Sequence, residues 1–583
     1  MNRRDFVRSA AGVATSALLP GCCGTICQRP SGPFLKLADI HCHLFNGSDL
    51  PVVRFVKIVL LHDYPREGIA TLDIRNPDAV DGMIMLLTWI VGRTAAPSAV
   101  EEVRILDGAA RAKVVNRVRA VNEKSVIDTV AAFTMDKGFA VAAGMSPNGP
   151  PLVRQAILSA ASGGGFAVSD VPLSKEEAQN VAERAFRSST NIGRYLRWFA
   201  LFTRYRHALA EELSELHRCQ GFEPLILCPA AVDYDFWLGE RVDASPMPDQ
   251  VTVMGRLARR TTGTPVHGYV GFDPLRQAYR VDGKFPAYDP LELVRRAIVE
   301  EGFIGVKLYP PMGFKPLENE SDACQTYPAD PSTIDPVADL APGAASDPAA
   351  VDCKVRPTNG SRIVGRKLDA ALESLFDLCV REDASVLAHS NHSNASNKDY
   401  GARADPAFWV PVFKRWPSLR VSLGHFGHFA YRAAHAPAST PLPEASWEWA
   451  LGNYIKSIGD PPVFADISFL TEIFGKSPEE LAAYAQKVQR WVQTFDPECR
   501  HLLFGTDWSM LGIDADAERF TRGIYDFFRQ SCGFDEVRLD RLFFGNAGRF
   551  LGLRRGDRTR DRLLQFYARN GIPVARLPEF AVA

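Results

Sequence analysis

The sequence predicts an α/β fold of the (β/α)8, or TIM-barrel, class. Short runs rich in valine, isoleucine, leucine and phenylalanine alternate with longer segments of helical periodicity, which is the pattern of repeated βα units on a parallel sheet. We expect the eight strands at residues 37–44, 225–229, 266–272, 303–309, 385–389, 419–425, 463–469 and 501–507. Together they complete a barrel within a span close to the roughly 250 residues typical of this architecture.

Two segments interrupt the repeat of strands and helices. Residues 46–220 follow the first strand and show helical periodicity at 99–122, 124–133 and 175–216, so we expect a large, mostly helical insertion. Its apolar runs at 55–61 and 83–91 should form its core, and the stretch 142–165, rich in Gly, Ala, Ser and Pro, should be a loop. Residues 315–362 follow the fourth strand and are expected to be a long loop that covers the catalytic face, with a disordered surface excursion as the alternative.

Composition and charge exclude some classes of function. The 583 residues are 46% hydrophobic, enough for a large core, and 67 Lys and Arg against 68 Asp and Glu give a net charge of −1. We therefore expect no nucleic-acid partner. The 11 cysteines contain no pair of CxxC motifs, which excludes a zinc ribbon by spacing. Beyond the first 21 residues, the apolar runs fall short of the roughly 20 residues that span a bilayer.

Residues 1–36 are expected to be a leader and linker. The sequence RRDFV at residues 3–7, ahead of a short apolar stretch at 10–19, resembles a twin-arginine export signal. The sequence LPGC at residues 19–22 resembles a bacterial lipoprotein cleavage box with Cys22 as the acylated residue, although its proline departs from that pattern. We expect an exported, periplasmic protein, and the sequence leaves open whether Cys22 anchors it to a membrane.

Residues suited to chemistry gather where the predicted strands end. Asp39-Ile40-His41-Cys42-His43 closes the first strand, and residues two apart on a strand point the same way, so both imidazoles can reach one ion. His389 ends the fifth predicted strand, His425 the sixth and Asp507 the eighth. Barrel enzymes place their chemistry at the C-terminal ends of the strands, so these residues should share one site.

Six motifs give the chain a resemblance to the amidohydrolase superfamily. They are DIHCH at 39–43, GVKLYP at 305–310, VLAH at 386–389, LGHFG at 423–427, LFGTD at 503–507 and GNAGRFL at 545–551. In this order they are most similar to the amidohydrolase-related branch that includes aminocarboxymuconate-semialdehyde decarboxylase and related metal-dependent hydrolases. The resemblance covers residues 37–46 and about 220–553 of a barrel domain at 37–553. The helical insertion, the long loop and a C-terminal extension at 554–583 lie outside it.

The resemblance implies the ligands of a metal centre. His41, His43 and His389 would supply nitrogen ligands, and Asp507 an oxygen ligand, to one divalent metal. Three imidazoles and one carboxylate suit zinc with a water in the open position, and manganese or iron fits almost as well. Such a metal lowers the pKa of its water towards ~7. Asp507 would take up the proton of that water, and His425 would orient the nucleophile or polarise the substrate as acid or base.

Some positions leave alternatives open. His392 and His428 each follow a candidate histidine by three residues and are rivals for its role. Lys307 lies near the place where some superfamily members bridge two metals with a carboxylated lysine, but the Lys-Leu-Tyr-Pro sequence favours a lysine that faces the substrate or lies at the edge of the core. Asn391 is a further candidate for substrate binding.

The predicted function is metal-dependent hydrolysis of an amide, lactone or ester-like bond of a small molecule. A non-oxidative decarboxylase of an aromatic or unsaturated acid is the alternative, because it uses nearly the same ligands on the same fold. An exported binding protein without turnover is a third reading, against which the intact metal positions argue. The sequence contains no Gly-x-Ser-x-Gly motif of a serine esterase. It leaves open whether the protein forms a homo-oligomer.

Overall fold

The computed structural model describes residues 29–60, 77–94, 96–108, 111–135, 149–162, 173–239, 242, 244–281, 288–321, 359–391, 395–396, 400–426 and 446–581. The predicted leader with Cys22, most of the predicted loop at 315–362, and the candidates His392 and His428 lie outside the described residues.

Eight parallel strands within the described residues form the centre of the fold. They are β1 (Leu35–Cys42), β2 (Phe222–Pro229), β3 (Tyr269–Gly271), β4 (Gly305–Leu308), β5 (Ser385–His389), β6 (Val421–Gly424), β7 (Val463–Asp466) and β8 (Leu502–Leu503). β3 to β8 pair in chain order as one sheet, and β1 pairs with β2 as another. Each of the eight expected strands overlaps an observed one, and the α/β class is confirmed.

Backbone hydrogen bonds connect the two sheets at both edges. On one side, the backbone N–H of His267 donates to the carbonyl of Leu227 in β2 at 3.0 Å. On the other, the N–H of Ile40 in β1 donates to the carbonyl of Phe504 at 3.2 Å, and that of Thr506 donates to the carbonyl of His41 at 3.0 Å. These contacts bring the first and last strands together, while a fully closed barrel stays a prediction.

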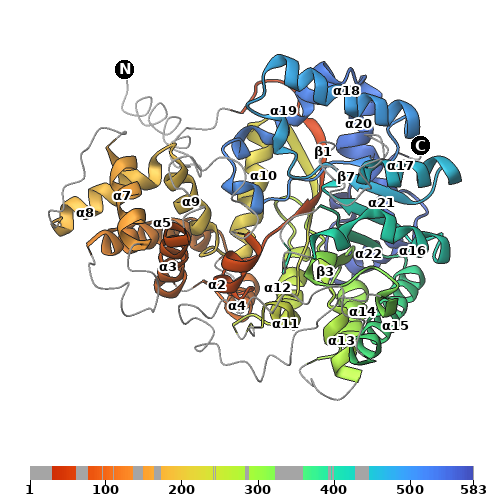
Figure 1. Ribbon diagram of the computed structural model, residues 1–583, viewed down its shortest axis with the longest axis horizontal. Helices are drawn as coiled ribbons and strands as arrows, with labels where there is room; N and C mark the ends of the chain where they lie inside the picture. Colours follow the sequence, from red (N-terminus) through yellow and green to blue (C-terminus); the bar gives the residue numbers. More distant parts are fainter. Residues whose placement is uncertain are drawn as a thin grey trace, which may run out of the picture.

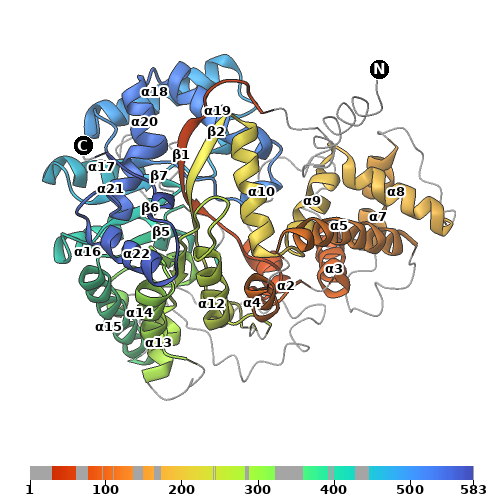
Figure 2. The same ribbon diagram turned by 180° about the vertical axis from the view of Figure 1, so that it is seen from behind.

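Helices surround the strands, as Figure 1 and its reverse view in Figure 2 show. They include α12 (Met247–Ala258), α13 (Pro274–Val281), α14 (Pro290–Glu300), α15 (Asn359–Glu382), α16 (Val410–Arg415), α17 (Trp447–Ile458), α18 (Pro478–Phe495), α19 (Phe520–Asp526), α20 (Glu536–Asp540), α21 (Asn546–Leu551) and α22 (Arg558–Arg569). α18 shows how the sequence starts a helix: the hydroxyl of Ser477 accepts from the backbone N–H of Glu480, whose carboxylate accepts from the N–H of Ser477. Its buried face then packs inward through residues such as Val488 and Trp491.

The described part of the segment between β1 and β2 is helical and forms a lobe beside the strands, except that its last helix lies against β2 (Figures 1 and 2). It contains α2 (Val52–Arg54), the π-helix η1 (Phe55–Leu60), α3 (Pro77–Thr94), α4 (Ala99–Asp107), α5 (Arg111–Met135), α7 (Gly149–Ala161), α8 (Lys175–Arg187), α9 (Asn191–Leu201) and α10 (Arg206–Cys219). The helix expected over 99–122 is broken at Gly108, which caps α4, and Thr190 caps α9 within the helix expected over 175–216.

The loop expected at 142–165 is wrong, because α7 occupies its centre. Proline is tolerated in the first turn of a helix, where the backbone N–H groups have no intrahelical partner. Beyond that turn, Val153 and Ile157 lie four residues apart and both are buried, so an apolar helical stripe decides the structure of this segment.

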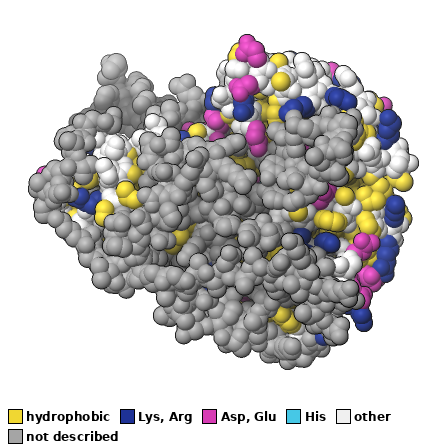
Figure 3. All heavy atoms as spheres, in the orientation of Figure 1, with side chains coloured by type: hydrophobic (Ala, Val, Ile, Leu, Met, Phe, Trp, Pro, Cys, Tyr) yellow, Lys and Arg dark blue, Asp and Glu magenta, His cyan; other side chains and the backbone are white. Residues whose placement is uncertain are grey.

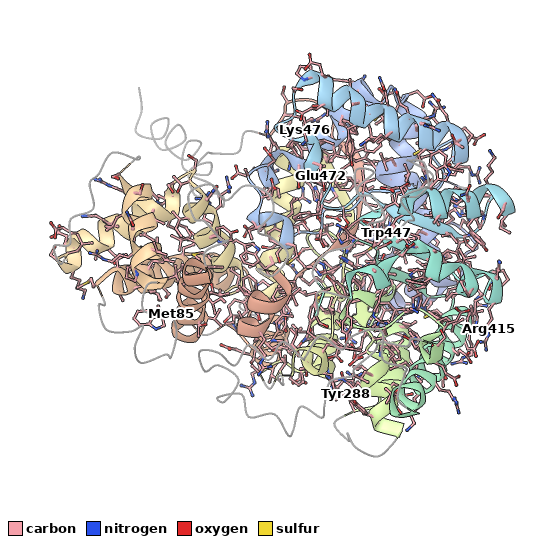
Figure 4. The ribbon with its side chains drawn as sticks, viewed as in Figure 1. Met85, Tyr288, Arg415, Trp447, Glu472 and Lys476 are labelled. Atoms are coloured by element: carbon pink, nitrogen blue, oxygen red, sulfur yellow. The ribbon has the colours of Figure 1, made fainter. Side chains whose placement is uncertain are left out.

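The interior of the α/β body is apolar. Side chains such as Ile40, Ile226, Leu387 and Leu503 form one cluster with the C-terminal segment that ends at Phe580. Described charged side chains of both signs are interspersed on the surface in Figure 3. Met85 of α3 marks the helical lobe in Figure 4, and Arg415 of α16 lies across the molecule from it. Among the described residues, no helix has both the length and the apolar character that a bilayer crossing requires.

Candidate metal centre

His41 is held in the centre of the fold by close packing. It is fully buried on β1. A Cβ on Gly424 would lie 2.8 Å from its Cε1 atom, and one on Gly505 would lie 2.7 Å from its Cβ. Real Cβ atoms do not approach other heavy atoms so closely, so both positions require glycine. The glycines in the LGHFG and LFGTD motifs therefore make room for the imidazole of the DIHCH motif.

The structure brings His41, His43 and Asp507 together at the C-terminal ends of the strands. Their ligand atoms all lie within 4.8 Å of one another. Oδ1 of Asp507 lies 2.9 Å from Nε2 of His43 and 3.6 Å from Nε2 of His41. Asp507 follows β8 rather than ending it, and its backbone has a φ of 58°. This left-handed conformation is strained for a residue with a side chain, and such strain is concentrated at functional sites.

The hydrogen bonds of the two imidazoles suit a cation between these atoms. Nδ1 of His43 lies 2.8 Å from the carbonyl oxygen of Ala230, so Nδ1 carries the proton and donates it there. In the neutral ring, Nε2 then presents a lone pair to the carboxylate of Asp507. Two acceptors at 2.9 Å repel each other unless a proton or a metal ion lies between them. His41, His43 and Asp507 are therefore a donor set that fits a divalent metal.

Asp466 orients His41 from behind. Its carboxylate accepts from Nδ1 of His41 at 3.1 Å, which leaves Nε2 directed at Asp507. It also accepts from the backbone N–H of His425 at 3.2 Å and from that of Ser468 at 3.1 Å. Burial opposes ionisation of Asp466, but His41, His425 and the hydroxyl of Ser468 hold the pKa of its carboxyl below the usual value.

The sequence reasoning missed Asp466. The signal was present, since the apolar run Val463-Phe464-Ala465 ends in a buried acid at the same edge as the other candidates. The ligand atoms of Asp466, His41 and His425 form a second group within 4.8 Å.

His425 lies directly after β6, with a φ of 64°. Its Nδ1 lies 3.2 Å from the carbonyl oxygen of Ser468, and its ring centroid lies 4.9 Å from that of His41 and 4.7 Å from that of His389. Burial opposes ionisation of Asp507, but the neighbouring imidazoles of His425, His43 and His41 hold the pKa of that carboxyl below its usual value. The carboxylate is therefore present as a ligand or proton acceptor at neutral pH.

Lys307 and His389 adjoin the first group but belong to neither set of three. Nζ of Lys307, on β4, lies 2.8 Å from Nε2 of His41. Burial lowers the pKa of Lys307 to about 8. Nε2 of His389, the last residue of β5, lies 3.1 Å from the backbone carbonyl of Asn391. Burial lowers the pKa of His389 well below its ordinary value, and the neighbouring His425 adds to this, so the ring is a neutral imidazole.

One cavity opens onto these residues. His43, Lys307, His389, His425 and Asp507 all contribute to its wall. Among the described lining residues, the candidates for metal binding and for acid–base chemistry therefore share one space.

Comparison with known proteins bears on this arrangement. Residues 281–553 match the amidohydrolase family model. The amidohydrolase match contains β4 to β8 and hence Lys307, His389, His425 and Asp507, whereas β1 with His41 and His43 precedes it. The match supports the activity of a metal-dependent hydrolase and the use of a divalent metal cofactor. It does not distinguish which kind of bond is cleaved.

The similarity of this chain to solved structures is weak. A metal-dependent hydrolase structure from Lactobacillus casei aligns with 91% of this chain and 96% of its own, at 14% identity and a TM-score of 0.34. Two structures of an amidohydrolase from Burkholderia multivorans, one with bound HEPES and one with bound zinc, align with 61% of this chain and 91% of their own. Their identities are 14% and 12% and their TM-scores 0.34 and 0.33, which do not establish a common fold. No curated protein matches the sequence.

Proposed function

We propose that the protein is a hydrolase of the amidohydrolase-related branch that cleaves an amide, lactone or ester-like bond of a small molecule with one divalent metal, zinc in the first instance. The observation that carries this proposal is the 2.9 Å approach of Nε2 of His43 to Oδ1 of Asp507. Because the other ring nitrogen of His43 donates to a carbonyl, a cation is the natural partner of both atoms.

The metal, when bound by His41, His43 and Asp507, would supply a water of lowered pKa and polarise the scissile carbonyl. The remaining tasks fall to side chains of the cavity. Asp507 is ionised and can accept a proton from a water beside it. His425 lines the same cavity and can deliver a proton to the leaving nitrogen or oxygen. His389 and Lys307 border the space in which the carbonyl would lie.

The charges in the cavity leave the decarboxylase as the alternative. A decarboxylase needs a cationic or amide group to clamp the carboxylate of its substrate. Two cationic side chains line the described cavity, Lys307 and Arg206. The guanidinium of Arg206 is held by Asp49 and by Glu102 at 2.9 Å, so it is engaged within the protein. Lys307 contacts Nε2 of His41, the atom proposed to bind the metal, so this contact does not distinguish hydrolysis from decarboxylation.

Metal content and turnover test the proposal together. Purified protein should contain about one equivalent of a first-row divalent metal, and a screen of lactones, N-acyl compounds and aromatic acids should find hydrolysis. The double variant His41→Ala, His43→Ala should lose both. Full metal occupancy in that variant would refute the metal assignment, and turnover of aromatic acids with release of carbon dioxide would replace the hydrolase by the decarboxylase.

We also propose that the chain is exported to the periplasm, on the strength of its twin-arginine motif. Arg3→Lys combined with Arg4→Lys should retain the precursor in the cytosol, because the export receptor recognises the arginine pair. A lipid anchor at Cys22 is tested separately. Cys22→Ser should release the protein from the membrane fraction, and unchanged fractionation would reject the anchor while leaving the export route standing.

A further inference from the structure

The cavity wall contains the metal candidates and, beyond them, the side chains of Phe45, Phe55 and Val59, which form its aromatic end. Ring contacts connect this end to the metal candidates. Phe45 lies 5.7 Å from His43 and 6.1 Å from Phe55, measured between ring centroids. Two phenylalanine rings therefore follow His43 in this part of the wall.

The ring contacts continue from Phe55. Phe55 lies 5.2 Å from Tyr234, Tyr234 lies 5.6 Å from Tyr309, and Tyr309 lies 4.5 Å from His389, again between ring centroids. Burial keeps the hydroxyl of Tyr234 protonated, because it raises the pKa of that group. A continuous series of ring contacts thus connects His43 to His389 through Phe55.

The polar groups at this end are already satisfied by one another. Arg206 pairs with Asp49 through its Nε atom at 3.0 Å and with Glu102 through Nη1 at 2.9 Å. Nε2 of Gln250 donates to the backbone carbonyls of Asp49 at 3.1 Å and Ser245 at 2.9 Å. A charged substrate group placed here would lose its hydration without gaining a partner among these residues.

The aromatic end is built by the helical insertion. Phe55 and Val59 lie on η1, outside the segment that matches the amidohydrolase family. The insertion is fixed to the α/β body by hydrogen bonds: Nη1 of Arg54 donates to the carbonyl of Leu238 at 2.9 Å, and Nε1 of Trp198 donates to the carbonyl of Ser509 at 3.0 Å. The shape of this end is therefore set by residues of this chain that the family match does not contain.

We propose that the aromatic end is a specificity pocket for an uncharged, apolar acyl group. The substrate class is an N-acyl or O-acyl compound, or a lactone with an alkyl side chain, whose scissile carbonyl lies at His43 and Asp507 and whose chain extends between Phe45 and Tyr234 towards Val59. This inference rests on the proposed hydrolase function.

Chain length tests the inference. In a series of p-nitrophenyl esters from acetyl to decanoyl, kcat/KM should rise about fourfold per methylene until the pocket is full, since each buried methylene contributes about 0.8 kcal/mol. Val59→Ala should move the optimum to a longer acyl chain. Val56→Ala is the matched control, because Val56 is a buried valine of the same helix that does not line the cavity. It should leave the optimum unchanged.

A binding measurement separates this inference from the hydrolase proposal. Calorimetric titration with neutral n-alkyl carboxamides needs no turnover, and Kd should fall with chain length in the same way. Length-dependent binding without hydrolysis of any ester would support the pocket and refute the hydrolase. A flat dependence of both Kd and kcat/KM on chain length would overturn the pocket, as would an equal shift of the optimum in Val56→Ala and Val59→Ala.

Discussion

Replacing Asp466 by Asn isolates the role of the carboxylate behind the metal site. Asp466 accepts from Nδ1 of His41, from the backbone N–H groups of His425 and Ser468, and from the hydroxyl of Ser468. An amide keeps one oxygen and turns an NH2 group towards the remaining donors. His41 would then lose either its orientation or its charge-assisted hydrogen bond.

The expected loss is 10- to 100-fold in metal affinity, the usual effect of removing a group that orients a ligand. This corresponds to about 1.4–2.7 kcal/mol of binding free energy. The affinity is measured by competition with a chromophoric chelator at fixed pH, and kcat is measured on the same preparation at saturating metal.

The control for Asp466→Asn is Asp496→Asn. Asp496 is a buried carboxylate that accepts from the backbone N–H groups of Arg500 at 2.7 Å and His501 at 2.9 Å, and it does not line the cavity. Both variants should lose about 1–3 kcal/mol of stability, because each turns an NH2 group towards buried donors. Only Asp466→Asn should weaken metal binding. Parent-like metal affinity in Asp466→Asn, or an equal loss in Asp496→Asn, would refute the orienting role.

Two further predictions address catalysis and stability. The variant His425→Ala should retain its metal while kcat falls by roughly 10²–10⁴-fold. Asp507→Asn should instead lower metal content and kcat together. Metal content and kcat are measured on the same samples, and loss of metal in His425→Ala would make His425 a ligand. Burial lowers the pKa of His267 to about 4 in the folded protein. As the pH falls below 6.5, His267 is therefore protonated in the unfolded chain before it is protonated in the folded protein. The free energy of unfolding should decrease by about 3 kcal/mol between pH 6.5 and pH 4 as a result. His267→Asn, compared with the parent in urea titrations at pH 7 and pH 4, should lack this part of the decrease, and an identical decrease in both proteins would contradict it.

The positions of the strands followed from the sequence because buried parallel strands appear as short apolar runs between helices. Their ends did not. The residues expected to end the sixth and eighth strands, His425 and Asp507, lie beyond β6 and β8 with φ values of 64° and 58°. Glycine usually adopts such angles, so apolar patterning has no signal for them.

The candidate site was predictable in part. The grouping of His41, His43 and Asp507 followed from motifs at strand ends, and the structure brings these three together. Asp466 and the aromatic end of the cavity were missed for a physical reason. Asp466 acts through its contact with an imidazole 425 positions away in the chain, and Phe55 comes from an insertion whose packing against the strands no periodicity reveals.

The two halves of the metal site are made at very different times. His41 lies on the first strand and His43 directly follows it. Asp507 follows the last strand, next to Thr506, which hydrogen-bonds to Asp39 across 467 positions of the chain. A ribosome that adds ~5–20 residues per second needs roughly 20–90 s to travel between them. Through that interval both histidines emerge without the carboxylate that completes the proposed site, so an ion bound tightly by all three residues would mark a chain whose synthesis has passed its last strand.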